Sequence, residues 1–260
     1  MAYIFFKLGA NMISTFANAG VLGGVILLLA LPALRKPAAR GWVFLLVIAA
    51  AADFLLTDLG GHWQKFYPVF AASHWNWSGK IAGAAAMLAI AVVLIAFRYF
   101  KASDIGLNIR QAPGTGRVML FAIAPFLIVS AVLMATIFGD SKPPTADTLA
   151  FQATMPGLAE ELCYRGVLLA LLDRMFAGRV RLLGAELGYG AVATSIAFGL
   201  LHGLIFDANL VLHTSLISGV SAGLFGFFLS WLRLRTKSLV LPVLVHNAAN
   251  LIFVAVPRLI

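Results

Sequence analysis

The sequence predicts an all-α, polytopic membrane protein with about eight transmembrane helices, on three observations. Of the 260 residues, 62% are hydrophobic and only 11% are charged, whereas soluble domains have about 25% charged residues. Apolar stretches of spanning length recur along the chain, and a helix is the open-chain structure that satisfies its own backbone groups in lipid. Basic residues are concentrated in alternate connections between these stretches. The predicted spans are approximately 13–34, 41–59, 79–98, 117–138, 154–174, 189–206, 211–232 and 238–256.

The N-terminal part, residues 1–145, is predicted to be a scaffold of transmembrane helices. Positive charge follows the first apolar run, beginning at Arg35, whereas a cleaved signal peptide carries its positive charge before that run. We therefore expect a retained first helix. Residues 62–80 are rich in Trp, Tyr and Phe and predict an interfacial aromatic segment. A connection at 139–148 that contains two prolines leads into the C-terminal part, residues 146–260, which is expected to be the catalytic core.

The distribution of basic residues predicts how the chain is oriented. The net charge of +9 could suggest nucleic acid, but membrane topology explains the short basic clusters better, so no nucleic-acid partner is expected. The positive-inside rule places both termini outside the cytoplasm, which agrees with an even number of spans. The densely charged connections carry Arg35/Lys36/Arg40, Arg98/Lys101/Arg110/Arg117, Arg174/Arg179/Arg181 and Arg233/Arg235/Lys237. The other connections and the two ends carry Lys7, Lys65, Lys80, Lys142 and Arg258.

Two adjacent glutamates, Glu160 and Glu161, lie inside the fifth apolar stretch. A charged group in hydrocarbon costs roughly 2.5 kcal/mol or more on insertion scales, so a function is expected for it. On a helix the two side chains point about 100° apart. Arg165 follows Glu161 at the i,i+4 spacing that favours an ion pair, which leaves Glu160 to face a cavity as a general base. The alternative is a buried salt bridge that only fixes helix packing, but this accounts for one glutamate and not for both.

Two later apolar stretches also carry polar side chains. Phe198 and His202 share one helix face, and so do His246 and Asn250. Two donors on one wall can stabilise an oxyanion; alternatively, each motif only links neighbouring helices by hydrogen bonds. At 1.5 Å per residue, Glu160, His202, His246 and Asn250 lie about 21, 20, 13 and 20 Å from the basic ends of their helices. These similar depths predict one shared site.

The ordered motifs EExxxR, FxxxH and HxxxN, within about residues 148–255, resemble the CPBP family of intramembrane proteases. That family includes the type II CAAX prenyl endopeptidases and lysostaphin-resistance-type proteins. The resemblance implies a glutamate-dependent peptidase, in which the first glutamate and the histidine of the second motif activate water and the third motif holds the oxyanion. The implied catalytic residues are Glu160, His202, His246 and Asn250, and the supporting residues are Glu161, Arg165 and Phe198.

A metal is the main alternative to this mechanism, because Glu, two His and Asn could ligate zinc. No HExxH motif occurs in the chain, although zinc hydrolases commonly bring two ligands on one helix in that way. We therefore expect no metal and no other cofactor. The single cysteine, Cys163, is expected to be a packing residue rather than a nucleophile. Asp53 lies inside the second span, and the sequence does not decide whether it only packs against neighbouring helices or contacts the cavity.

The sequence thus predicts an integral, multi-pass membrane endopeptidase, in the cytoplasmic membrane if the protein is bacterial. Its expected partners are the lipid bilayer and a membrane-associated, lipidated or exported protein or peptide. One alternative is a proton-coupled transporter, although the chain lacks the internal repeat common in transporters. The other is a non-catalytic immunity or assembly partner. The charge distribution places the site nearer the outer face, whereas the resemblance implies a cavity open to the cytosol, so the sequence leaves the orientation of the site open.

Overall fold

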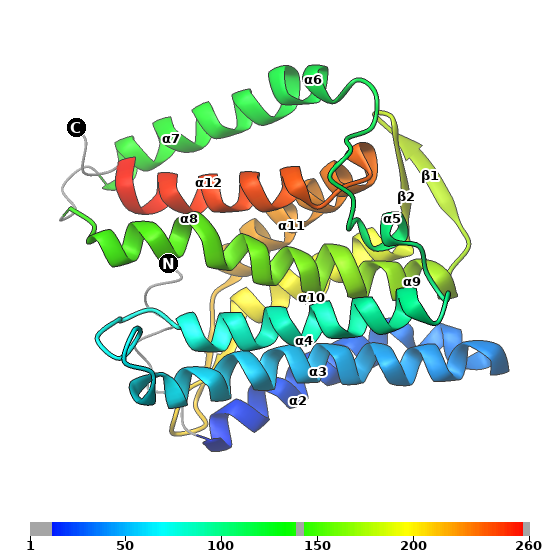
Figure 1. The fold of residues 1–260 in the computed structure, drawn as a ribbon, viewed down its shortest axis with the longest axis horizontal. Coiled ribbons are helices and arrows are strands. Elements are labelled where there is room, and N and C mark those ends of the chain that lie inside the picture. Colours follow the sequence, from blue (N-terminus) through cyan, green and yellow to red (C-terminus); the bar gives the residue numbers. More distant parts are fainter. Residues whose placement is uncertain (1–11, 139–142, 257–260) are drawn as a thin grey trace.

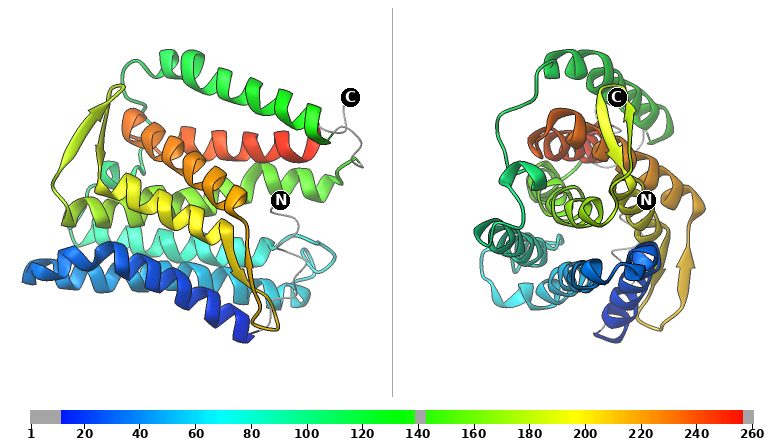
Figure 2. Two further views of the ribbon diagram at one scale, coloured as in Figure 1. Left: turned by 180° about the vertical axis from the view of Figure 1, so that it is seen from behind. Right: turned by 90° about the vertical axis from the view of Figure 1, so that its right-hand side faces the viewer.

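The computed structural model describes residues 12–138 and 143–256. Its long helices lie nearly parallel to one another as a bundle (Figures 1 and 2). The N-terminal part contains α2 (Met12–Ala30), η1 (Leu31–Arg35), η2 (Pro37–Ala39), α3 (Arg40–Trp63), η3 (Gln64–Phe66), α4 (Trp77–Ala96), α5 (Ala102–Ile105), α6 (Thr115–Val118), η4 (Met119–Ile123) and α7 (Ala124–Phe138). The C-terminal part contains α8 (Ala146–Glu161), η5 (Leu162–Leu168), α9 (Leu169–Met175), β1 (Arg179–Leu182), β2 (Ala185–Gly188), α10 (Tyr189–Gly203), β3 (Leu204–Phe206), β4 (Leu212–Thr214), α11 (Leu216–Thr236) and α12 (Val240–Ala255).

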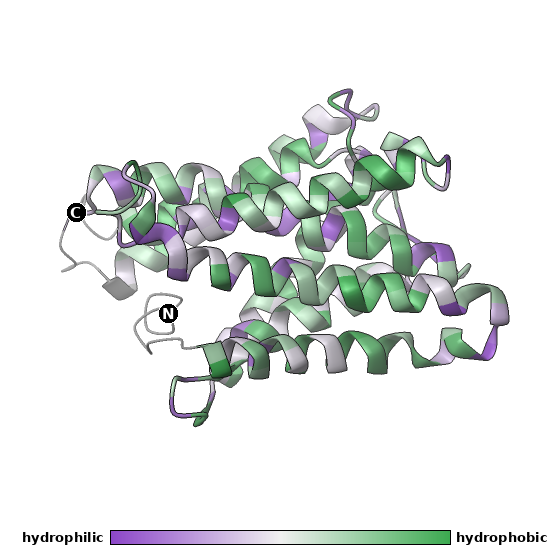
Figure 3. Cartoon of the chain, turned by 60° about the horizontal axis from the view of Figure 1, so that its bottom comes forward, coloured by the Kyte–Doolittle hydropathy of each residue, from purple (hydrophilic) through white to green (hydrophobic). Residues whose placement is uncertain are grey.

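Within the described residues, 5 helices are long and apolar enough to cross a membrane. The protein is therefore a multi-pass membrane protein of all-α class, but the predicted number of eight spans is not confirmed. The helices that carry the polar motifs fall outside this set, because α8 is less apolar and α10 and α12 have only 15 and 16 residues. Figure 3 shows hydrophobic residues along the helices and hydrophilic residues largely in the connections. The spans are Met12–Arg35, Pro37–Phe66, Trp77–Ala96, Thr115–Thr136 and Leu216–Thr236.

Two short antiparallel hairpins, which the sequence did not predict, interrupt the helical fold. β1 pairs with β2, and the turn between them has positive φ at both Leu183 (47°) and Gly184 (81°), as a two-residue hairpin turn requires. β3 pairs with β4 between α10 and α11. The predicted span 189–206 therefore ends early, at Gly203.

Asp207 explains the second hairpin. Its carboxylate accepts hydrogen bonds from the backbone N–H groups of Asn209 and Val211 and from Nε2 of His213. Such local bonds offer the backbone an alternative to a helix. The bond from His213 also holds the pKa of the Asp207 carboxyl below its usual range.

The densely charged connections meet at one end of the bundle, where α5 and the β1–β2 hairpin lie in Figure 1. Arg174 donates to the carbonyl oxygen of Tyr99 and Arg235 to that of Pro113, at 3.0 and 3.1 Å. The guanidinium of Arg174 also lies 4.8 Å from the ring centroid of Trp42. These contacts join three of the basic connections to one another and reach Trp42 at the start of α3, next to the fourth, but which end faces the cytoplasm stays a prediction. Lys7, Lys142 and Arg258 lie outside the described residues.

The two parts of the chain share one hydrophobic core rather than folding as separate bodies. Buried residues of α2, α3 and α4 pack with those of η5, α9 and α10 in a single cluster. The aromatic segment before α4 adds polar links to α8, since Trp77 Nε1 donates to Asp147 Oδ1 at 2.9 Å and Trp75 Nε1 donates to Thr148 Oγ1 at 3.0 Å. Tight packing therefore crosses the predicted boundary near residue 145, and the separate roles of the two parts stay a prediction.

Close packing of α10 on α11 depends on glycine. A Cβ atom on Gly199 would lie 2.6 Å from the carbonyl oxygen of Gly219 and 3.0 Å from Cα of Gly223. Both neighbours are main-chain atoms, so the helices would have to move apart. This contact fixes the helix that carries His202.

We expect Gly199→Ala to lower the free energy of unfolding by about 1–3 kcal/mol, the usual cost of overpacking. Thermal unfolding of the protein in detergent micelles measures it. Gly24→Ala is the matched control, because nothing lies within 4 Å of its added Cβ. If Gly24→Ala lowered the free energy of unfolding as much as Gly199→Ala does, close packing of α10 on α11 would not explain the effect.

Candidate active site

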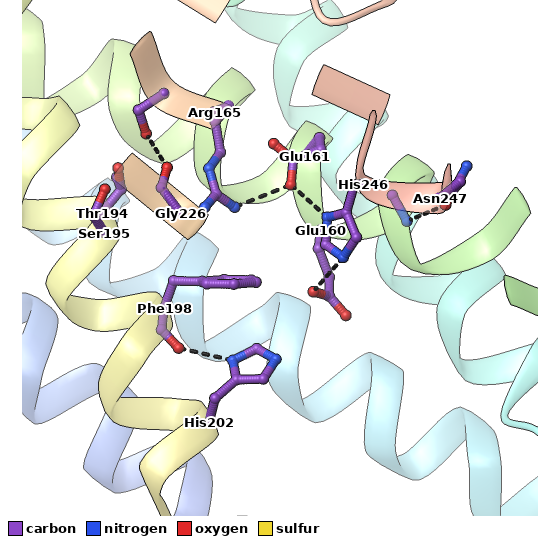
Figure 4. A network of polar contacts seen from close by, with 12 residues as sticks. Glu160, Glu161, Arg165, Thr194, Ser195, Phe198, His202, Gly226, His246 and Asn247 are labelled. Carbon is purple, nitrogen blue, oxygen red and sulfur yellow. Dashed lines mark hydrogen bonds and ion pairs between the residues drawn. The ribbon is translucent and has the colours of Figure 1, made fainter. Parts of the chain in front are cut away.

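Glu160, in the last turn of α8, has two oxygens in different surroundings (Figure 4). Oε1 lies 2.6 Å from Nζ of Lys80, on α4. Oε2 lies 3.8 Å from Nε2 of His246 on α12, and is buried without a hydrogen-bond partner among the described residues. The carboxylate is therefore held by Lys80 at one oxygen, while the other oxygen lies near His246 and can still accept a hydrogen bond.

Glu161 points away from Glu160 and belongs to a buried chain of polar contacts. Its Oε1 accepts a hydrogen bond from Nη1 of Arg165 at 3.1 Å, and both side chains are 0% exposed. The same oxygen lies 2.8 Å from Nδ1 of His246. A carboxylate only accepts, so Nδ1 carries the proton and Nε2 faces Glu160. The predicted pair is thus present, and it also orients His246, which the spacing did not indicate.

The helix changes from α to π geometry directly after the two glutamates. The π-helical turn η5 spans Leu162–Leu168, includes Arg165 and is buried throughout. Such turns are rare and occur frequently at functional sites. The guanidinium of Arg165 lies 4.4 Å from the ring centroid of Phe198, so the wide turn brings the first and second motifs into contact.

His202 lies in the last turn of α10, and Figure 4 shows its ring below Phe198, in the same region as Glu160 and His246. Its Nδ1 lies 2.8 Å from the carbonyl oxygen of Phe198. A carbonyl oxygen only accepts, so Nδ1 carries the proton, and Nε2 of the neutral ring is left as an acceptor. The ring also packs on Phe198, with 4.3 Å between centroids. Phe198 therefore supports both Arg165 and His202, as predicted for a shared helix face.

The two asparagines of the third motif have different roles. Asn247 Oδ1 accepts from the backbone N–H of Gly157 at 2.8 Å, and its Nδ2 donates to the carbonyl oxygen of Thr154 at 3.2 Å. These bonds tie α12 to α8 beside Pro156, which lacks an N–H. Asn250 is partly buried, one turn after His246, and makes no hydrogen bond to another described residue. Its predicted role as an oxyanion donor stays a prediction.

Lys80 is the site residue that the sequence reasoning missed. The charge pattern places it in a sparsely charged connection, but it lies inside α4 and pairs with Glu160. Asp53 on α3 interacts electrostatically with Lys80 and lies near Cys163. The available signal was the rule that an ionisable group in a membrane helix needs a partner, applied to Lys80 and Asp53 together.

Metal binding is the alternative chemistry for these side chains. Among the described residues, no group of three or more His, Cys, Asp or Glu side chains is arranged to hold a metal ion. Independence from metals and other cofactors stays a prediction, to be tested by activity after treatment with a chelator.

Residues 143–252 match the family model for type II CAAX prenyl endopeptidase Rce1-like proteins. These residues form an Rce1-like domain. This range is close to residues 148–255, over which the sequence resembles the CPBP family, and the three motifs lie inside it. The family is one of peptide-bond hydrolases, so the Rce1-like domain gives this membrane protein a CAAX-type protease activity. Comparisons with curated proteins and with solved structures give no match. Lys80 and Asp53 lie outside the Rce1-like domain.

Proposed function

We propose that the protein hydrolyses a peptide bond in a membrane-associated, lipidated or exported protein or peptide, with water activated by Glu160 and His202. The observation that carries the proposal is the oxygen Oε2 of Glu160, which is buried, lies 3.8 Å from Nε2 of His246 and has no hydrogen-bond partner among the described residues. A buried acceptor without a partner is costly. A water bound to Oε2 would satisfy it and would lie where a general base removes its proton.

In the proposed reaction, the water donates one hydrogen bond to Glu160 Oε2 and one to His202 Nε2. Glu160 takes a proton while the water oxygen attacks the carbonyl carbon of the peptide bond. The oxyanion accepts hydrogen bonds from protonated Nε2 of His246 and from the side-chain amide of Asn250. The C–N bond then breaks, and Glu160 returns the proton to the leaving amine.

A groove between α10 and α11 supports a substrate with an apolar chain. Its volume is about 570 Å³, and it follows the helix that carries His202, on another face of that helix. Apolar groups dominate its wall, which suits a lipid chain or an apolar segment of a substrate. Its lining includes Ile196, Leu200, Leu204, Val220, Leu224 and Phe227.

We expect His202→Ala to slow precursor cleavage by about 100-fold or more, the contribution of a well-placed acid–base group. The membrane proteome of cells that lack the protein is compared with that of cells making wild-type protein, His202→Ala or His74→Ala. His74 is exposed and serves as the matched control.

A precursor should accumulate without the protein and with His202→Ala, and should disappear with wild type and with His74→Ala. Processing at wild-type rate by His202→Ala would reject the role of this histidine. If no precursor accumulates in any strain, the function of a transporter or of a non-catalytic partner is favoured over that of a protease.

A further inference from the structure

The ion pair between Lys80 and Glu160 joins the two parts of the chain at the site. The distance from Nζ to Oε1 is 2.6 Å, and the two side chains are only 16% and 18% exposed. Exposed ion pairs are worth little because water screens them, whereas a pair in these surroundings interacts strongly. Lys80 also lies outside residues 143–252, so the family match does not account for it.

Several contacts fix the position of Lys80 in the bundle. A Cβ on Gly60 would lie 2.7 Å from Cα of Gly79, so the start of α4 packs directly on α3. Asn76 caps α4 by accepting from the N–H of Gly79 at 2.9 Å, and it donates to the carbonyl oxygen of Thr57 at 2.8 Å. The bonds from Trp75 and Trp77 hold the same end of α4 on α8. The ammonium group is therefore delivered to Glu160 from a rigid backbone.

The charges around the pair come from four other elements. Asp53 of α3 and Cys163 of η5 face Lys80, while His202 of α10 and His246 of α12 face Glu160. Glu161 is already paired with Arg165 on its own helix. Lys80 is thus the ammonium group in contact with Glu160, and the other described cation nearby, Arg165, is committed to Glu161.

We propose that Lys80 is a positioning residue for catalysis: it keeps Glu160 ionised and holds Oε1, so that Oε2 faces the water. This inference rests on the proposed role of Glu160 as general base. Without the ammonium group, the carboxylate would bind its proton more tightly, and rotation about its last bond would no longer be restrained. Both effects would reduce the fraction of enzyme ready to activate water.

The test compares Lys80→Met with Lys80→Arg, and uses Lys65→Met as the matched control because Lys65 is exposed. The values of kcat and KM are measured against pH, with the accumulating precursor as substrate in detergent micelles. For Lys80→Met we expect kcat to fall at neutral pH by about 100-fold with little change in KM, as for a misplaced catalytic group.

The decisive readout is the acid limb of the pH profile of kcat/KM. Loss of a cation beside a carboxylate should move this limb up by about 1–3 pH units, so activity should recover as the pH rises. Lys80→Arg should keep the limb in place, and Lys65→Met should match wild type. An unmoved limb in Lys80→Met, or a loss equal in the Arg and Met variants, would overturn the inference.

A second measurement does not depend on cleavage. Unfolding of Lys80→Met, Glu160→Gln and the double variant gives the coupling between the two side chains. Additive effects would show that the pair does not form, which also overturns the inference. If Glu160→Gln cleaves as well as wild type, the proposed function fails. If it is inactive while Lys80→Met equals wild type at every pH, only the inference about Lys80 fails.

Discussion

Replacement of Glu160 by glutamine is expected to lower kcat by about 10³–10⁴-fold, near the upper end of what a general base contributes. Glutamine keeps the size of the side chain and the oxygen that faces Lys80, but it has no carboxylate to accept a proton. The binding of substrate should change less than kcat, because the general base acts on the water in the transition state and not on the bound substrate.

Glu186→Gln is the matched control for this experiment. Glu186 is the third glutamate of the chain and is exposed on β2, away from the site. The cleavage rate of each purified variant is measured together with its unfolding temperature, so that an inactive protein is distinguished from an unfolded one. More than about a tenth of wild-type activity in Glu160→Gln would mean that another group takes the proton.

The second large effect concerns stability. We expect Arg165→Met to lower the free energy of unfolding by about 3–5 kcal/mol, the usual result of removing one partner of a buried ion pair. Glu161 is 0% exposed, and its Oε2 has no hydrogen-bond partner among the described residues. Its charge would then be compensated by His246 alone, and the contact of the guanidinium with Phe198 would also be lost.

Chemical or thermal unfolding in micelles measures the effect of Arg165→Met. Arg181→Met is the control, since Arg181 is exposed on β1 and surface substitutions usually change stability by within about 0.5 kcal/mol. The double variant Glu161→Gln with Arg165→Met should recover part of the loss, because both charges are gone. A loss below about 1 kcal/mol for Arg165→Met would show that this pair is not required for the fold.

The membrane helices were predictable because the bilayer imposes a simple rule on the sequence. The apolar run near 79–98 corresponds to α4 (Trp77–Ala96), and the run near 41–59 lies within the helix Pro37–Phe66. The rule works less well for α10, because the polar bonds of Asp207 end the apolar run in a hairpin. Local hydrogen bonds of this kind depend on backbone geometry, which average hydropathy does not describe.

Within the site, spacing along one helix was informative and contacts between helices were not. The i,i+4 pair of Glu161 with Arg165 and the shared face of Phe198 and His202 follow from helix geometry. The bond of His246 to Glu161 involves residues 85 positions apart. That contact depends on how α12 lies against α8, which includes the bonds made by Asn247.

The sequence by itself determined that the chain lies in a membrane, that ionisable groups stand within its helices, and which motifs carry them. Hydrophobicity and helical periodicity are local properties, so they can be read without coordinates. Only the tertiary structure decided that Lys80, from the N-terminal part, meets Glu160. Helix packing brings these residues together across 80 positions of the chain, and no local pattern specifies which buried cation reaches which buried carboxylate.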